Sequence, residues 1–437
     1  MTQPIRSGRA ERQPLIGAWK EFVSCILGPS VRYGDDWALL IFYWVQSMPQ
    51  YPNVASSAQS VSDSVYSKVR HSKSDESPIP LHVGDTWMEP ALGCRMQDLT
   101  VEDYPGLHRY SAVPGLSELR KAIAEHHGAR SQVETSPNQV LVTAGATAGL
   151  AATVGALVSP GESVLLTAPY WPLIAGSLRA FGAQAIDVPL MTDVDDSAPD
   201  AVEQVLARFE AARRPDTVAV YWNTPHNPTG RLMPRGWLDA LVDWARQNDL
   251  WIFADDVYED YVYSGQHVYT RALAPERTIS VHSFSKAYGM AGNRCGYLVG
   301  PQEGISAIRR IMTNINYSAC TASQTAALKA LQGAGQAWVD QAREKYAEIG
   351  AWAADRLGVA APAGSTFLFV DVSEALNNDS DKKDLPTLLQ RLAELGVIVA
   401  PGPSFGPYPH HIRVCFTATD PARTRQGIER LALFLKR

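Results

Sequence analysis

Short apolar runs alternate with helical stretches through the middle of the chain, and this alternation constrains the fold more than any other feature. The runs with the length and composition of buried strands are 139–145, 163–169, 217–225, 250–256 and 278–284. Helical spacing is found in the segments 116–129, 146–158 and 234–249. Continuous apolar strands that alternate with helices are typical of a mostly parallel sheet covered on both faces. The sequence therefore predicts an α/β fold.

A different pattern follows the long helical stretch that reaches residue 357. Apolar runs at 365–372, 397–402 and 411–417 are combined with a helical segment at 385–395 and a last helix. This order is typical of a smaller α+β unit. A chain of 437 residues is long enough for both units.

Composition narrows the functional classes. A hydrophobic content of 46%, a charged content of 19% and a net charge of −6 indicate a globular protein and give no support for nucleic-acid binding. The five cysteines are scattered and lack CxxC spacing, which argues against a disulfide framework or a zinc site and favours a reducing compartment. The amino end lacks the apolar run of a signal peptide, and the apolar stretch 37–45 is too short to span a bilayer. We expect a soluble, cytoplasmic protein with no membrane, nucleic-acid or metal partner.

Polar residues follow several of the predicted strands, at the point where each strand ends. The small-residue turn 145–147 leads into a helix, where free backbone N–H groups suit a phosphate. Asn227 lies in a proline-rich turn, and Asp255 ends a strand three residues before Tyr258. Because ligands of parallel α/β sheets bind beyond the carboxyl ends of the strands, we expect these groups to converge.

The segment that follows the last of these predicted strands, 278–284, is rich in polar residues. Ser283, Lys286 and Arg294 follow directly on an apolar run. Each feature alone is also typical of an ordinary turn or a surface lysine. Together, a lysine, a buried carboxylate, a phenol, an amide and a phosphate-binding turn are the partners that pyridoxal 5′-phosphate needs. The combination therefore predicts this cofactor.

The segment SFSKAYGMAGNRCGY, residues 283–297, resembles the cofactor-lysine segment of class I/II aminotransferases, which belong to the fold type I superfamily of pyridoxal-phosphate enzymes. The other strand-end motifs occur in the order of that family, and the resemblance covers about residues 80–437. It implies a mostly parallel sheet of the seven-stranded type between helices and a smaller α+β C-terminal domain. The activity that it implies is the transfer of an amino group from an α-amino acid to a 2-oxo acid.

The resemblance gives roles to the matching cofactor residues. Lys286 matches the lysine that bonds to the cofactor and moves the proton of the substrate α-carbon. Asp255 matches the partner of the pyridine nitrogen, while Tyr258 and Asn227 match the ligands of the 3-hydroxyl oxygen. We therefore expect Lys286, Asp255 and Tyr258 to be catalytic. The residues that match the phosphate site are Gly145, Ala146, Thr147, Ser283 and Arg294.

Further matches concern the substrate. Trp171, with Tyr170 as the neighbouring alternative, stands where the family places an aromatic ring stacked on the cofactor. Arg413 matches the arginine that pairs with the substrate α-carboxylate through two parallel hydrogen bonds. Gly84 and Trp87 complete the predicted substrate site, to which Asn227 also belongs.

The resemblance also predicts the assembly and the domain limits. Tyr110 matches a tyrosine that reaches the phosphate of the neighbouring subunit, which implies a homodimer with a shared active site. The expected organisation is an amino-terminal extension (1–60), a segment that contributes to the small domain and the substrate pocket (61–104), a large cofactor-binding domain (105–335) and a small domain (336–437).

Departures from the family pattern concern the substrate more than the cofactor. Residues 86–88 replace a Pro-Asp-Phe-like stretch, Asp256 stands where a glutamate is usual, and Thr366 is also unusual. No second arginine for a dicarboxylic side chain is identifiable from the sequence. The tryptophans Trp87 and Trp171 favour an aromatic or bulky apolar amino acid.

Several activities share these cofactor residues. C–S β-lyases, decarboxylases and amino-acid oxidases begin with the same imine between substrate and cofactor and the same carbanion at the substrate α-carbon. A non-catalytic binding protein that retains the fold is a further alternative, which the presence of Lys286 disfavours. The sequence alone does not name the amino donor, the acceptor or the pathway.

Overall fold

The computed structural model describes residues 77–378 and 384–436. The extension predicted for residues 1–60, the apolar stretch 37–45 and the first part of the predicted substrate segment, residues 61–76, lie outside the described residues. No helix in the described part of the chain is long and apolar enough to cross a membrane.

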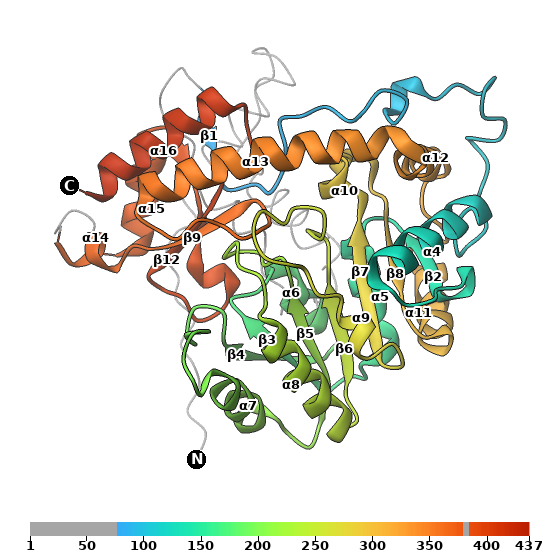
Figure 1. Cartoon of the computed structure of the whole chain (residues 1–437), viewed down its shortest axis with the longest axis horizontal. Helices are drawn as coiled ribbons and strands as arrows, with labels where there is room; N and C mark the ends of the chain where they lie inside the picture. Colours follow the sequence, from blue (N-terminus) through green and yellow to red (C-terminus); the bar gives the residue numbers. More distant parts are fainter. Residues whose placement is uncertain (1–76, 379–383, 437) are drawn as a thin grey trace, which may run out of the picture. The chain divides into compact units, whose positions relative to one another are not determined.

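A seven-stranded sheet forms the centre of the described structure, with the strand order β2-β8-β7-β6-β5-β3-β4 (Figure 1). The strands are β2 (Val140–Thr143), β3 (Ser163–Ala168), β4 (Gln184–Pro189), β5 (Thr217–Asn223), β6 (Trp251–Asp255), β7 (Thr278–Ser283) and β8 (Gly296–Val299). Strand β8 is antiparallel to β2 and β7, and the remaining pairings are parallel. The predicted α/β fold with a mostly parallel sheet is confirmed.

Helices pack on both faces of this sheet. On one face lie α5 (Ala146–Leu157), α6 (Pro172–Ala180) and α11 (Gln302–Asn316). On the other lie α4 (Ser117–Ser131), α7 (Ala201–Ala212), α8 (Arg235–Gln247) and α9 (Thr270–Leu273). Successive side chains of a strand point to opposite faces. Tyr221 of β5 therefore lies in the core under α5, α6 and α11, while Trp222 lies in the core under α7 and α8.

A C-terminal unit is built on a small antiparallel sheet in the order β11-β12-β9. Its strands are β9 (Phe367–Asp371), β11 (Ala400–Pro401) and β12 (His411–Cys415). Strand β1 (Ile79–Pro80) pairs in parallel with β10 (Val397–Ile398), which joins the amino-terminal end of the described chain to this unit. The helices of this part are α13 (Gly335–Leu357), α14 (Ser373–Asn378), α15 (Leu385–Glu394) and α16 (Pro421–Leu435). Helix α12 (Thr321–Lys329) precedes them and contacts α4 of the large unit.

The sequence analysis missed two strands of the central sheet, β4 and β8. Strand β4 is an edge strand whose residues are mostly exposed or half-buried, so it lacks the continuous apolar run of its neighbours. Strand β8 has four residues, starts at Gly296 and continues directly from the predicted lysine segment. A strand this short has no period of its own to separate it from a loop.

Candidate active site

A cavity of about 560 Å³ lies beyond the carboxyl ends of β5, β6 and β7. It brings together most of the residues predicted from sequence: Gly84, Ala146, Thr147, Trp171, Asn227, Asp255, Tyr258, Ser283, Lys286, Arg294 and Arg413. Strands that run in the same direction end at the same edge of the sheet, which explains how segments far apart in sequence meet here.

Asp255 is the buried carboxylate of the cavity, with only 3% of its surface exposed. The hydroxyl of Tyr221 on the neighbouring strand donates to Asp255 Oδ2 at 2.7 Å, and the backbone N–H of Val257 donates to Oδ1 at 3.4 Å. Burial raises the pKa of Asp255 to about 6, although both hydrogen bonds oppose the shift. Keeping this buried carboxylate ionised therefore costs free energy, which a cationic ligand group would offset.

A chain of amides connects Asp255 with Arg413. Asn223 donates from Nδ2 to the backbone carbonyl of Asp255 at 2.7 Å, and its Oδ1 accepts from the backbone N–H of Asn227 at 2.6 Å. Arg413 Nη1 in turn donates to Asn227 Oδ1 at 3.0 Å. These contacts fix the Asn227 side chain at the cavity wall. Asn223, which also lines the cavity, was missed by the sequence analysis.

Arg413 is held from several sides. Its Nη2 donates to the backbone carbonyl of His82 at 2.6 Å. The guanidinium carbon lies 4.2 Å from the ring centre of Phe367 and 4.7 Å from that of Phe405, so the planar group packs against two aromatic rings. A guanidinium with a fixed plane presents its donors in a constant direction, which suits the bidentate binding of a carboxylate.

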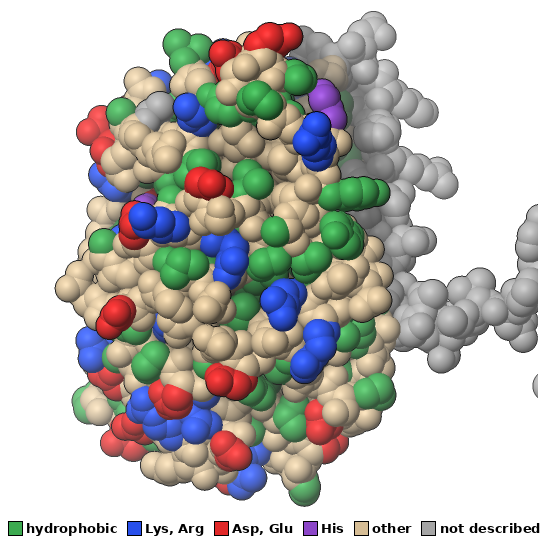
Figure 2. Space-filling model, turned by 90° about the vertical axis from the view of Figure 1, so that its right-hand side faces the viewer, with side chains coloured by type: hydrophobic (Ala, Val, Ile, Leu, Met, Phe, Trp, Pro, Cys, Tyr) green, Lys and Arg blue, Asp and Glu red, His purple; other side chains and the backbone are tan. Residues whose placement is uncertain are grey.

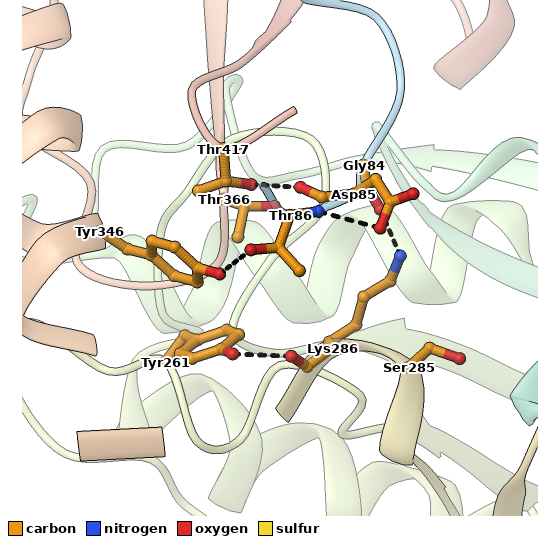
Figure 3. A pocket seen from close by; sticks show the side chains of 9 residues that line it. All are labelled: Gly84, Asp85, Thr86, Tyr261, Ser285, Lys286, Tyr346, Thr366 and Thr417. Carbon is orange, nitrogen blue, oxygen red and sulfur yellow. Dashed lines mark hydrogen bonds between the residues drawn. The ribbon is translucent and has the colours of Figure 1, made fainter. Parts of the chain in front are cut away.

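Lys286 lies on α10 (Phe284–Ala287), a four-residue helix directly after β7. The Ser283 hydroxyl caps this helix by accepting from the backbone N–H of Ser285 at 3.0 Å. Lys286 Nζ donates to the carbonyl of Gly84 (Figure 3). Burial lowers the pKa of the Lys286 ammonium, opposed by the charge of Asp85. A lysine with a lowered pKa has more of the neutral amine that acts as a nucleophile or a base.

Hydroxyl groups surround the far side of Lys286 (Figure 3). Tyr261 donates to the backbone carbonyl of Lys286 at 2.6 Å and thereby stabilises the position of α10, the helix that carries the lysine. Thr86 Oγ1 contacts the hydroxyl of Tyr346, and Thr417 donates to the backbone carbonyl of Asp85 at 2.6 Å. Thr86, which is unusual for the family at this position, thus anchors the segment that contains Gly84, and the carbonyl of Gly84 accepts the hydrogen bond from Lys286.

The first turn of α5 forms a cationic cradle. Gly145 precedes this helix with a φ of 80°, a conformation that favours glycine. A Cβ atom at this position would collide with Arg294 Nη2, so only glycine allows the guanidinium to lie against the backbone here. Arg294 Nη1 is held by the Ala291 carbonyl at 2.8 Å. A helix N-terminus beside a fixed arginine fits a phosphate group, so these residues fit the cofactor phosphate.

Some predicted residues lie elsewhere. Trp87 is not among the residues that line the cavity; it packs edge-to-face on Tyr346 with 5.2 Å between ring centres. Tyr110 is 88% exposed, outside the cavity of the chain itself. Tyr170, the alternative to Trp171, directs its hydroxyl to Asp187 at 3.0 Å, whereas Trp171 lines the cavity.

Residues 87–431 match the family described as aminotransferase class I and II. The chain belongs to this family. A probable aspartate/prephenate aminotransferase of Thermus aquaticus is 32% identical over 338 residues, which cover 76% of this chain and 85% of that protein. The arginine–pyruvate transaminase of Pseudomonas aeruginosa is 31% identical over 338 residues, covering 75% and 82%.

Solved structures of aminotransferases share the fold. A Thermus thermophilus aspartate aminotransferase tetra mutant complexed with tryptophan has a TM-score of 0.78 and 28% identity, covering 88% of this chain and all of that one. The aromatic aminotransferase of Pyrococcus horikoshii has a TM-score of 0.73 and 26% identity, covering 83% and 96%. The predicted family, enzyme class and cofactor are confirmed: the protein is a pyridoxal-phosphate-dependent aminotransferase that moves an amino group from an α-amino acid to a 2-oxo acid.

Proposed function

We propose that the cavity residues hold pyridoxal phosphate in the roles that the sequence suggested. Lys286 bonds to the cofactor, and Asp255 pairs with the pyridine nitrogen. Tyr258 and Asn227 bind the 3-hydroxyl oxygen, and Trp171 stacks on the ring. The phosphate is bound by Gly145, Ala146, Thr147, Ser283 and Arg294. The observation that carries this proposal is the convergence of a buried carboxylate, a lysine of lowered pKa and a cationic helix N-terminus on one cavity.

The bound cofactor supplies an electron sink for the substrate α-carbon. The protein's own groups do the rest. Asp255 keeps a proton on the pyridine nitrogen, which gives the ring its electron demand. Once the substrate amine takes the place of Lys286 on the cofactor, the freed amine of Lys286 would take the proton from the α-carbon and hold it at Nζ, which its lowered pKa favours. Arg413 holds the α-carboxylate in two parallel hydrogen bonds and so orients the α-C–H bond.

The amino donor that we propose has an aromatic or bulky apolar side chain. Support comes from the apolar part of the cavity lining, which includes Val83, Leu150, Trp171, Leu173, Val257 and Phe367. Trp87, the other residue that suggested this preference, does not line the cavity. Arg179 of α6 does line it, which makes acidic amino acids the competing donors.

The assembly that we propose is a homodimer in which Tyr110 reaches the phosphate of the other subunit. The ring of Tyr110 is 88% exposed and meets Tyr317, 46% exposed, edge-to-face at 5.2 Å between ring centres. Such a pair of exposed aromatic rings suits an interface. Figure 2 shows the side of the molecule on which α4, α11 and α12 lie, where hydrophobic side chains occur among charged residues of both signs.

The expected domain limits, 105–335 and 336–437, remain part of the proposal. They are supported by the extent of the seven-stranded sheet, from Val140 to Val299, and by the separate sheet of the C-terminal unit. The described cysteines are free, which is in keeping with a cytoplasmic location.

An amino-acid panel tests the proposed chemistry. Purified enzyme is mixed with each amino acid and a set of 2-oxo acids, and both products and ammonia are quantified. We expect amino transfer that requires an acceptor, with the highest kcat/KM for aromatic or bulky apolar donors. A preference for aspartate or glutamate would overturn the donor class. Release of ammonia and pyruvate without any acceptor would indicate a lyase.

A further inference from the structure

Tyr221 is a polar residue inside an apolar strand, and its hydroxyl faces the carboxylate of Asp255, which we propose to pair with the cofactor. Strands β5 and β6 pair with Asn223 opposite Asp255, so Tyr221, two residues earlier, lies on the same face of the sheet. Its hydroxyl donates to Asp255 Oδ2 at 2.7 Å. Tyr221 has no exposed surface, and Asp255 is 3% exposed.

Packing alone does not account for a phenol here. The ring of Tyr221 lies in the apolar core with Leu166, Phe253 and Val281, where phenylalanine would fill nearly the same space. A buried phenol needs a hydrogen-bond partner, and this one has a carboxylate. A hydrogen bond to a charged group is about twice as strong as one between neutral groups.

We infer that Tyr221 is a positioning residue that keeps Asp255 ionised and leaves its Oδ1 oxygen to the pyridine nitrogen of the cofactor. This inference rests on the proposed role of Asp255. Within the part of the chain that the structure describes, Oδ1 accepts one long contact, 3.4 Å from the backbone N–H of Val257. The oxygen opposite Tyr221 therefore retains capacity for a ligand donor.

Other groups around Asp255 act more weakly. Burial raises the pKa of the carboxyl, and the hydrogen bond from Tyr221 is the largest effect that lowers it. The charge of Asp256 raises this pKa and that of His282 lowers it. Tyr258 is a further titratable neighbour, and burial raises the pKa of its phenol, with a smaller contribution from Asp255. The donor that most strongly favours the ionised form is thus Tyr221.

The consequence concerns the position of one proton. A carboxylate and a pyridine nitrogen share a proton, and the group with the higher proton affinity keeps it. A phenol that donates to the carboxylate lowers its proton affinity, so the proton stays on the ring. Without the hydroxyl, the proton moves toward Asp255 and the ring becomes a poorer electron sink.

The test uses the complete enzyme loaded with cofactor that carries 15N in the pyridine ring. In Tyr221→Phe we expect the 15N resonance to move toward the value of unprotonated pyridine. We expect kcat to fall about tenfold to a hundredfold with little change in KM, because Arg413 is untouched. Replacement of Tyr221 by 3-fluorotyrosine makes the phenol a stronger donor at nearly constant shape and should move the resonance the opposite way.

The matched control is Tyr408→Phe. Its hydroxyl also donates to a carboxylate, Asp193, at 2.7 Å, and Tyr408 is 5% exposed and does not line the cavity. This variant loses the same atom and the same kind of bond, and we expect an unchanged resonance. A resonance that stays at the wild-type value in both Tyr221 variants overturns the inference, including where Tyr221→Phe loses stability.

A third arm separates this inference from the proposed function. Asp255→Asn should abolish ring protonation if Asp255 is the partner of the pyridine nitrogen. If this variant moves the resonance and the Tyr221 variants do not, only the role of Tyr221 is wrong. If none of them moves it, the placement of the cofactor is wrong as well.

Discussion

Two buried carboxylates four residues apart, Asp255 and Glu259, have opposite electrostatic environments. Asp255 ends β6 and lies on the cavity face of the sheet, and burial raises its pKa to about 6. Glu259 lies beside His282, whose ring stacks edge-to-face on His127 of α4, on the opposite face. Burial would raise the pKa of Glu259 too, but His282 and Arg130 hold it well below its usual value.

The difference lies in the partners. Glu259 Oε1 lies 2.8 Å from His282 Nδ1, Oε2 accepts from the hydroxyl of Tyr269 at 2.6 Å, and Arg130 Nη1 is 4.0 Å away. Asp255 has a phenol and one long backbone contact, and no ion pair within the described residues. A buried carboxylate that the fold leaves without a cation is the one prepared for a cationic ligand group.

The largest effect expected from the cavity side is that of Lys286→Ala. An ε-amino group is required for the covalent bond to the cofactor, and among the described residues that line the cavity only Lys286 supplies one. We expect the visible absorbance of the lysine-bound cofactor to disappear and activity to fall to background. A surviving absorbance band would place the cofactor lysine elsewhere in the chain.

Arg413→Ala should have the next largest effect. We expect kcat/KM to fall by roughly 2–4 kcal/mol while cofactor content is nearly unchanged, because a buried partner of the substrate carboxylate is lost. Arg413→Lys serves as the conservative control and should restore little, since an ammonium cannot reproduce the planar two-point contact. If amines without a carboxylate react as well as amino acids do in both wild type and Arg413→Ala, Arg413 is structural.

Substitutions on the face of the sheet opposite the cavity should change the free energy of unfolding, by a smaller amount that depends on pH. Burial lowers the pKa of His282, but Glu259 outweighs it and leaves the pKa raised above 6.5. The ion pair therefore contributes fully below pH 6.5 and loses this contribution as the pH rises through the raised pKa. We expect His282→Gln to destabilise the protein by about 1–2 kcal/mol at pH 6 and by less at pH 9. Urea unfolding at the two pH values measures this; equal losses at both would contradict a charged pair.

Part of this site could be predicted from sequence because it follows local rules. Asp255, Asn227 and Lys286 each follow an apolar run, and parallel strands bring such ends together. Tyr221 and Asn223 were missed because they belong to the apolar run itself. The alternation of side chains puts both on one face, but the register that sets Asn223 opposite Asp255 is a property of the assembled sheet.

Trp87 lies outside the cavity lining, although the resemblance placed it in the substrate site. It was predicted there because it belongs, with Gly84, to the segment that matches the amino-terminal substrate segment of the family. The chain turns between them: Thr86 binds the hydroxyl of Tyr346, and the indole of Trp87 packs on the same ring. The direction of a side chain in an irregular segment depends on such contacts, which have no period in the sequence.

The most direct test compares Asp255→Asn with Glu259→Gln, two neutralisations of nearly constant shape. For each, kcat/KM of the loaded enzyme and the unfolding free energy of the cofactor-free protein are measured at pH 8. Asp255→Asn should lose kcat/KM by orders of magnitude. It should keep or gain stability, on the order of 2 kcal/mol, because the raised pKa makes the ionised carboxylate unfavourable to the fold above pH 6.

Glu259→Gln should do the reverse. Because folding depresses the pKa of Glu259, the carboxylate stabilises the fold above its usual pKa of 4.5, through Arg130 and Tyr269 and, while that ring stays protonated, through His282. Its loss should cost about 3 kcal/mol at pH 8 while kcat/KM changes only a few-fold. This crossing of the two effects is the expected result. An Asp255→Asn enzyme with near-normal turnover, or a Glu259→Gln enzyme that is inactive but fully stable, would contradict the division between a carboxylate kept for the cofactor and one kept for the fold.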